Sequence, residues 1–245
     1  MKSKQNGASI ALVTGGGTGI GAACCRELAT AGFTIAIHYN RSHESAKKLH
    51  AELKNSFLLQ ADISTQQGMD SIYRELRERG GVEVLVNNAG MTVDAPLLTA
   101  KLEDFDRITA TNMRSTWYLT KRVARLMVRN RRGRIINISS VVGSVGNPTQ
   151  TIYGMTKAAI DNFTKTAAIE LAPYNILVNS VALGFIATQM TEMLSEKARD
   201  AILSRIPLGR IGTPEEVAQF VRFLVVKGSY CTGAVFHING GMHGG

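Results

Sequence analysis

Three polar side chains near the middle of the chain have the types and spacing needed to move a proton to or from an oxygen atom. Tyr153 and Lys157 are four residues apart. They fall in a segment, residues 152–171, that the sequence predicts as a helix, so both lie on one helical face. Ser140 ends an apolar stretch, residues 134–140, that is typical of a buried strand. A hydroxyl at a strand end, a phenol and an ammonium group could therefore meet at one point.

The residue types suggest what this group would do. A free phenol, with a pKa near 10, is a weak acid at neutral pH, and an ammonium group within about 4–6 Å lowers that pKa. Ser140 would hydrogen-bond the substrate oxygen and hold it near the Tyr153 hydroxyl. The pattern favours general acid catalysis on a carbonyl oxygen. Taken alone, however, a tyrosine and a lysine at this spacing are more often a helix anchor and a solvated charge.

A glycine-rich turn near the start of the chain is the second candidate site. Residues 8–14 form an apolar run typical of a parallel strand, GGGTGIG follows, and residues 20–31 predict a helix that ends at Gly32. Glycines let the backbone approach a pyrophosphate, and a helix N-terminus supplies N–H donors. The spacing is Gly15-x3-Gly19-x-Gly21 rather than the commoner GxGxxG. Strand, glycine turn and helix in this order favour a dinucleotide site over a turn without a ligand.

The segment that follows the second predicted strand helps to determine which dinucleotide binds. That strand covers residues 34–38. An acidic residue at this strand end usually binds the ribose 2′-hydroxyl of NAD. No acid stands there, and Arg41 follows instead. A guanidinium suits a 2′-phosphate by its bidentate geometry. We therefore expect NADPH (NADP+) rather than NADH, although Arg41 could also be a solvent-facing residue at the start of the next helix.

Strands and helices alternate along the whole chain. The further predicted helices cover residues 42–54, 66–79, 102–130 and 214–226, and the further strands cover residues 56–60, 83–87, 176–181 and 234–238. This alternation predicts an α/β fold, a Rossmann-type doubly wound parallel sheet with helices on both faces and ligands at the carboxyl ends of the strands. With no linker or repeat, residues 1–245 are expected to form one domain. Residues 185–207 are expected to form a substrate lid.

Composition excludes several function classes. The 245 residues hold no apolar run long enough to span a membrane, and the first residues lack the apolar core of a signal peptide. Three cysteines without metal-type spacing predict neither a disulfide framework nor a metal site, so we expect a cytoplasmic protein. The net charge of +9 comes without a nucleic-acid-binding motif, and we expect no nucleic-acid partner. An acidic protein or cofactor partner fits that charge better.

Five motifs together carry a resemblance. Thr14-Gly-x3-Gly-x-Gly21, Asn87-Asn88-Ala89-Gly90, Asn112 in a long predicted helix, Ser140 and Tyr153-x3-Lys157 occur in this order. The chain resembles the short-chain dehydrogenase/reductase family over residues 8–242, essentially its full length. Each motif by itself is weak evidence, but the five in this order are specific. They favour a catalytic role for Tyr153 and Lys157 over a helix anchor and a solvated charge.

The resemblance implies a role for each matching residue. Tyr153 would be the general acid, and Lys157 would bond the nicotinamide ribose while lowering the pKa of Tyr153. Ser140 would orient the carbonyl, and Asn112 would hold the water chain that returns a proton to Lys157. The implied cofactor contacts are Gly15, Gly17, Thr18, Gly19, Ile20, Gly21, Arg41, Asp62, Ile63, Asn88, Ala89, Gly90, Tyr153, Lys157, Ile186 and Thr188.

Within the family, VVGSVGNPTQTIYGMTKA, IPLGRIGTPEEVA and HINGGM are similar to 3-oxoacyl-[acyl-carrier-protein] reductases of bacterial fatty-acid synthesis. That likeness implies an acyl carrier protein (ACP) as partner and a homotetramer. Acyl carrier proteins are acidic, so Arg129, Arg131 and Arg132, expected beside the cleft, could attract them. An acetoacetyl-CoA or other small carbonyl reductase, and a nucleotide-binding regulator without turnover, stay open as alternatives.

Three positions depart from the subfamily pattern. Leu183 replaces the usual Pro before Gly184, which predicts a looser loop after it. Thr18 replaces an Arg, which leaves more of the 2′-phosphate recognition to Arg41. Tyr174 replaces a basic residue at the end of the helix that carries Tyr153, and this weakens the carrier-protein assignment.

Overall fold

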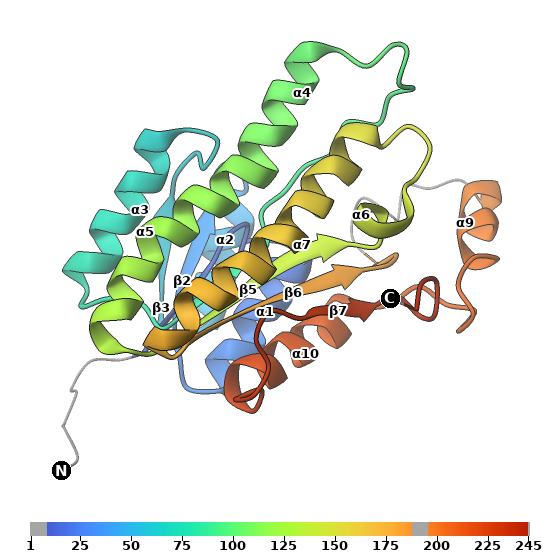
Figure 1. The fold of residues 1–245 in the computed structure, drawn as a ribbon. Helices are drawn as coiled ribbons and strands as arrows, with labels where there is room; N and C mark the ends of the chain where they lie inside the picture. The colour runs from blue at the N-terminus through green and yellow to red at the C-terminus, as the bar shows by residue number, and fades with distance from the viewer. Residues whose placement is uncertain (1–8, 188–195, 245) are drawn as a thin grey trace.

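A single parallel sheet of seven strands forms the centre of the molecule (Figure 1). The computed structural model describes residues 9–187 and 196–244. The strand order is β3-β2-β1-β4-β5-β6-β7, and every neighbouring pair is parallel. The order reverses between β1 and β4, and in such sheets ligands bind where the order reverses, at the carboxyl ends of the strands. The predicted α/β fold class is confirmed.

The strands are β1 (Ile10–Val13), β2 (Thr34–Tyr39), β3 (Ser56–Gln60), β4 (Val84–Asn87), β5 (Gly133–Ser140), β6 (Ile176–Leu183) and β7 (Val235–Ile238). The helices are α1 (Gly19–Thr30), α2 (His43–Glu52), α3 (Gln66–Glu78), α4 (Leu102–Thr109), α5 (Ser115–Asn130), α6 (Val142–Val145), α7 (Thr151–Leu171), α9 (Glu196–Leu203) and α10 (Pro214–Val226). A π-helical turn, η1 (Ala110–Arg114), joins α4 to α5, and a 3₁₀ turn, η2 (Ala172–Tyr174), follows α7.

Two apolar layers hold the helices against the sheet. One face of the sheet packs against α1, α2 and α10, with residues such as Val13, Leu28 and Val221 buried between them. The other face packs against α3, α5 and α7 and buries Leu12, Leu76 and Met127. Successive residues of β1 therefore serve opposite layers, as the two-residue period of a strand requires. Because both faces are covered, the strand ends are the part of the sheet left to bind ligands.

The structure adds short elements that the sequence did not predict. The helix expected over residues 102–130 is continuous, because the backbone stays helical where α4, η1 and α5 meet, but its middle turn, η1, is π-helical. The short helices α6 and α9 were not predicted. The expected lid covers residues 185–207. Of these, residues 188–195 lie outside the described residues, and the rest contains α9. The lid therefore remains a prediction. Among the described residues, no helix is long and apolar enough to cross a membrane, and no cluster of three metal-ligating side chains occurs.

Candidate active site

Ser140, Tyr153 and Lys157 lie together at the carboxyl end of β5. Ser140 is the last residue of β5, and α7 carries the other two one turn apart. The Ser140 hydroxyl, which accepts a hydrogen bond of 3.2 Å from the Val142 N–H, lies near enough to the Tyr153 phenol to lower its pKa. The Lys157 ammonium lies 5.5 Å from the centre of the Tyr153 ring, and it donates a hydrogen bond of 2.8 Å to the carbonyl oxygen of Ile138. The convergence expected from the sequence is present.

Burial sets the proton affinities of this group. It raises the pKa of Tyr153, which the Ser140 hydrogen bond opposes and the charge of Asp94 reinforces. Burial lowers the pKa of Lys157 to about 8, and the charge of Asp161 opposes that shift. The predicted lowering of the tyrosine pKa is therefore not found in this structure. Burial destabilises the phenolate by more than the neighbouring groups stabilise it.

Asn112 occupies the centre of the π-helical turn and is buried. Its side-chain oxygen accepts a hydrogen bond of 2.8 Å from the N–H of Met91. Its amide donates to the Met91 carbonyl at 2.9 Å and to the Thr156 hydroxyl at 3.2 Å. One side chain thus ties the segment after β4 to α7, just before Lys157. π-Helical turns are frequent at functional sites because they redirect a side chain inside a helix.

The glycine turn is built against the end of β4. The Thr14 hydroxyl accepts hydrogen bonds from the N–H groups of Asn88 at 2.9 Å and Ala89 at 3.0 Å. The Asn88 amide donates to the Thr14 carbonyl at 2.9 Å. A Cβ on Gly21 would lie 2.2 Å from the Gly15 carbonyl oxygen, so α1 can approach the turn only with glycine there. The predicted contacts Gly15, Gly21, Asn88 and Ala89 are brought together.

The first turn of α1 has the features of an anion site. Thr18 precedes the helix without capping it by its side chain, and no acidic residue stands in the first turn. The first N–H groups of a helix have no partners within the helix and carry a partial positive charge. Thr18 and Gly19 are exposed, whereas Gly17 is buried with its Cα facing Ser42 and Ala46 of α2. The absence of a side chain at Gly17 therefore serves the packing of α2.

His38, which no motif included, links the predicted contact Gly15 to Ala61, the residue before the predicted contact Asp62. Its Nδ1 accepts a hydrogen bond of 3.1 Å from the Gly15 N–H. Its Nε2 lies 3.1 Å from the Ala61 carbonyl and donates to it, since a carbonyl can only accept. Burial lowers the pKa of His38 to about 4, so the ring is neutral. The signal in the sequence was a lone histidine in an apolar strand beside the glycine turn.

Arg41 and Asp62 follow the ends of β2 and β3. Arg41 is exposed, and its guanidinium forms no hydrogen bond or salt bridge within the described parts of the chain. The pKa of Asp62 is lowered, first by its hydrogen bonds with Ser64 and further by the charge of Arg41. Ile63 is buried in the core, so only its backbone is available to a ligand. The two charged side chains are neighbours at the edge where the sequence predicted the adenosine.

The loop after β6 carries the last predicted contacts. Ile186 is buried, and its backbone pairs with Gly212 in a parallel bridge. Thr188 lies outside the described residues. Leu183 is buried and paired with both Ser140 and Ile238, so the loosening expected from the missing proline is not seen at that position.

The arginine cluster does not lie beside the cleft of its own chain, and that expectation is wrong. Arg129, Arg131 and Arg132 lie where α5 ends and β5 begins, whereas Ser140 is the last residue of β5. At about 3.3 Å per residue, the strand separates them by more than 20 Å. Arg131 donates to the Pro173 carbonyl at 2.7 Å, and Arg132 pairs with Glu83 at 2.6 Å. Arg129 forms no salt bridge within the described residues.

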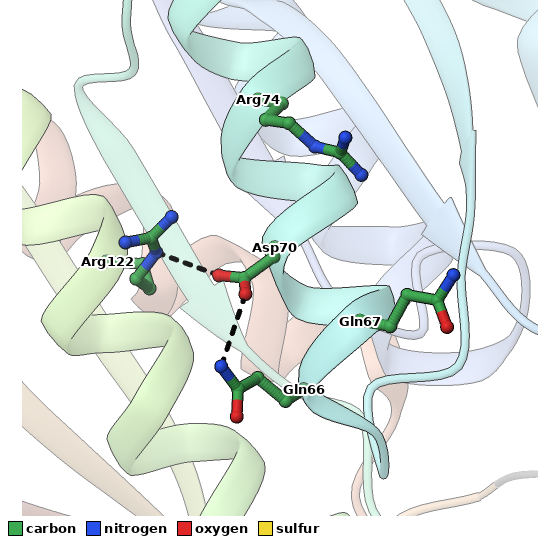
Figure 2. A pocket seen from close by; sticks show the side chains of 5 residues that line it. All are labelled: Gln66, Gln67, Asp70, Arg74 and Arg122. Atoms are coloured by element: carbon green, nitrogen blue, oxygen red, sulfur yellow. Dashed lines mark hydrogen bonds and ion pairs between the residues drawn. The ribbon is translucent and has the colours of Figure 1, made fainter.

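A polar surface hollow between α3 and α5 is distinct from these strand ends (Figure 2). Figure 2 shows Asp70 pointing toward Arg122, whose Nε lies 3.0 Å away, and Gln66 donating to the same carboxylate at 3.5 Å. The Tyr118 hydroxyl also donates to Asp70, at 3.0 Å. These contacts satisfy the carboxylate internally, and the hollow holds none of the predicted site residues.

Comparison with known proteins agrees with this geometry. A family model described as Enoyl-(Acyl carrier protein) reductase matches residues 15–243. The 3-oxoacyl-[acyl-carrier-protein] reductase FabG of Aquifex aeolicus (strain VF5) is 43% identical, over 99% of this chain and 100% of that protein. FabG of Staphylococcus aureus (strain Mu50) is 41% identical, over 95% and 97%, and the Synechocystis sp. reductase is 42% identical, over 96% and 97%. The chain belongs to the short-chain dehydrogenase/reductase family.

Membership explains why the site is spread over so many segments. The family motifs follow the ends of three strands that are neighbours in the sheet: β1 with its glycine turn, β4, and β5. The matched region contains the whole set from Gly15 onward. Two described residues that the motifs did not include also contribute to the site. These are His38 beside the glycine turn and Asp94, which accepts hydrogen bonds from Gln150 at 3.0 and 3.1 Å near the tyrosine.

Proposed function

We propose that the protein is a cytoplasmic reductase of 3-oxoacyl-ACP in fatty-acid synthesis, and that it uses NADPH. The observation that carries the proposal is the Ser140, Tyr153 and Lys157 group at the end of β5. This group lies next to the segment after β4, since a Cβ on Gly90 would be 3.7 Å from the Lys157 Nζ. The full-length likeness to three proteins named as reductases of this substrate supports the choice of substrate.

The cofactor proposal rests on residues that fit a dinucleotide. The close approach of Gly21 to Gly15 and the uncapped start of α1 form a cradle for a pyrophosphate. When bound, the nicotinamide would supply the hydride for the carbonyl carbon. Arg41, exposed and without a salt bridge among the described residues, is the group we assign to a 2′-phosphate. Thr18, also exposed, would stand beside it.

The three polar side chains divide the proton transfer between them. Ser140 would donate a hydrogen bond to the carbonyl oxygen and so hold it at the tyrosine hydroxyl. Tyr153 would give its proton to that oxygen as negative charge develops, and the raised pKa means that the proton is present at neutral pH. Lys157 would stabilise the phenolate that remains, and its free N–H groups would hold the ribose. Asn112 would keep the segment after β4 in place.

ACP is the partner we propose, and Arg129 is the residue we assign to its docking surface. Arg129 is the cluster member without a salt bridge among the described residues, so it is the one available to an acidic protein. Arg129→Glu should raise KM for an ACP thioester several-fold and leave KM for a CoA thioester unchanged, because only the former carries a folded acidic surface. Equal effects on both substrates would remove the cluster from the proposal.

The experiment that tests the function compares NADPH oxidation with acetoacetyl-ACP, acetoacetyl-CoA and crotonyl-ACP, at low and moderate salt. We expect a strong preference for acetoacetyl-ACP that weakens as salt rises. Activity only on acetoacetyl-CoA would favour the small carbonyl reductase. Activity on crotonyl-ACP would favour the reaction that the family model's description names. NADPH binding without turnover on any of them would favour a regulator.

Tyr153→Phe is the matched variant for this assay because it removes only the hydroxyl. It should bind NADPH normally and lose turnover by roughly 10²–10⁴-fold, the usual contribution of a general acid. Turnover close to that of the unmodified protein would contradict the acid role.

A further inference from the structure

A buried carboxylate that no motif includes lies one helical turn beyond Lys157. Asp161 is four residues after Lys157 on α7, so the two side chains share a face of the helix. That face packs against the sheet, and the two side chains are 4% and 8% exposed. Buried carboxylates without a partner are rare because losing water around the charge is costly. The position therefore requires an explanation.

Two serines on neighbouring strands hold this carboxylate. The Ser180 hydroxyl of β6 donates a hydrogen bond of 2.6 Å to Asp161 Oδ1. The Ser139 hydroxyl of β5 donates a hydrogen bond of 3.3 Å to the Lys157 carbonyl oxygen, and it lies near enough to the carboxylate to lower its pKa. Burial raises the pKa of Asp161, and the two hydroxyls and the charge of Lys157 oppose that rise, since hydroxyl donors favour the ionised form of a carboxyl group. The two strands thus hold a negative charge at a fixed place beneath the helix.

Lys157 is the positive group that this charge faces. Its Nζ contacts the Ile138 carbonyl at 2.8 Å and lies beside Gly90. Among the described residues, Asp161 is the one carboxylate whose charge acts on Lys157. A carbonyl dipole alone does not compensate a buried ammonium, which would otherwise release its proton.

We propose that Asp161 is a positioning residue for Lys157: held by Ser180, its charge keeps the lysine ammonium protonated and in place beside the cofactor cleft. The proposal rests on the proposed function, since it concerns the lysine of that site. Asp161 does not touch the reacting atoms. It acts through Lys157.

The groups that face Asp161 come from every element packed around it. They are Lys157 on α7, Ser139 on β5, Ser180 on β6 and His237 on β7, which lowers the pKa of Asp161 when its ring is protonated. His237 in turn stacks edge-on against His243, with ring centres 4.9 Å apart. Burial and His243 both lower the pKa of His237, so His237 is neutral at pH 7 and above. Lys157 is then the group whose titration Asp161 controls in the alkaline range.

The decisive measurement is the pH profile of kcat/KM for NADPH at saturating acyl substrate, because this ratio reports groups of the free enzyme. As pH rises, Lys157 loses its proton before Tyr153 does, so the alkaline limb reports the lysine. In Asp161→Asn we expect that limb to move down by about one pH unit, which is a roughly tenfold loss on its alkaline side. At pH near 6 the rate should approach that of the unmodified protein. A purely structural role would lower the rate equally at every pH.

Two controls accompany this variant. Asp161→Glu keeps the charge and should restore the limb. Glu170→Gln removes an exposed carboxylate from the same helix and should leave the profile unchanged. An Asp161→Asn profile that coincides with the unmodified one, or that is lowered without a shift, would overturn the proposal.

A second variant and a second readout cover the other outcomes. Ser180→Ala removes the 2.6 Å donor with little change in volume, and it should move the limb in the same direction by less. No shift in a folded Ser180→Ala protein would overturn the proposal even if Asp161→Asn fails to fold. The dissociation constant of NADPH, measured by nucleotide fluorescence, should rise at a lower pH in both variants. This readout needs no turnover, so it separates failure of this proposal from failure of the proposed substrate.

Discussion

His38 shows how one side chain can connect the parts of a binding cleft. Its ring joins the first residue of the glycine turn to the end of β3, near Asp62. The ring must be neutral to do this, since Nδ1 accepts a hydrogen bond. The unfolded chain has no such restriction and binds a proton near pH 6.5.

The predicted consequence is a pH-dependent stability. The folded pKa of His38 is about 4, below its ordinary value of 6.5. Between pH 4 and 6.5 the unfolded state therefore binds a proton at His38 that the folded state does not bind. The stability due to His38 is complete above pH 6.5 and falls as the pH drops toward 4. The slope is about 1.4 kcal/mol per pH unit. Urea unfolding of the unmodified protein and of His38→Gln at several pH values should differ by this slope. Parallel curves would show that His38 does not titrate on unfolding.

Arg41 is the residue on which cofactor choice is predicted to depend. Hydrogen bonds to a charged group contribute about 1.5–3 kcal/mol, so Arg41→Ala should weaken NADPH binding roughly ten- to hundredfold and NADH binding little. Isothermal titration with both nucleotides measures this. Lys47→Ala, which removes an exposed cation from the adjacent helix α2, is the matched control. An equal loss for both nucleotides would refute 2′-phosphate recognition.

At the scale of elements, the glycine turn and α1 work as one unit with the end of β4. Gly15 adopts a φ of 63°, which side chains disfavour, and Gly21 leaves room for the Gly15 carbonyl. The Thr14 hydroxyl and the Asn88 amide then fasten this unit to β4. A change in any one of these positions is expected to move the cradle as a whole.

Gly21→Ala tests this coupling. The added Cβ would lie 2.2 Å from the Gly15 oxygen and 2.7 Å from Asn88 Nδ2, so the turn or the helix must shift. We expect a loss of about 1–3 kcal/mol in the free energy of unfolding and a larger loss in NADPH affinity. Gly244→Ala, where a Cβ meets no heavy atom within 4 Å, controls for the chemical change. Unchanged NADPH affinity in Gly21→Ala would show that the turn does not hold the dinucleotide.

At the scale of the whole molecule, apolar side chains remain exposed on the helices of one face. Leu102 of α4, Trp117 of α5 and Ile169 of α7 are 71%, 48% and 78% exposed, and Met113 of η1 is 40% exposed. Large apolar groups exposed on the same face can form an interaction surface. We therefore propose that the chain forms a homotetramer through these helices, as the likeness to the reductases implies.

Light scattering coupled to gel filtration should give four times the chain mass of 26.5 kDa. Trp117→Glu should give a smaller species, because a charge in an apolar interface is not compensated. Ser45→Glu, exposed on α2 at the opposite face of the sheet, should keep the larger mass. A monomer of the unmodified protein at working concentration would contradict the assembly.

The sequence by itself determined the order of strands and helices, the glycine turn and the spacing of Tyr153 and Lys157, because these depend on local periodicity and on residues close in the chain. It could not determine what depends on packing between distant segments. The π-helical turn at Asn112 forms where the side chain bonds Met91 and Thr156, and periodicity does not report such contacts. The arginine cluster was misplaced because distance along a strand, not charge, separates it from the cleft. Only the tertiary structure brought His38 against Gly15 and Asp161 beneath Lys157, since burial and strand pairing, rather than any motif, make those contacts.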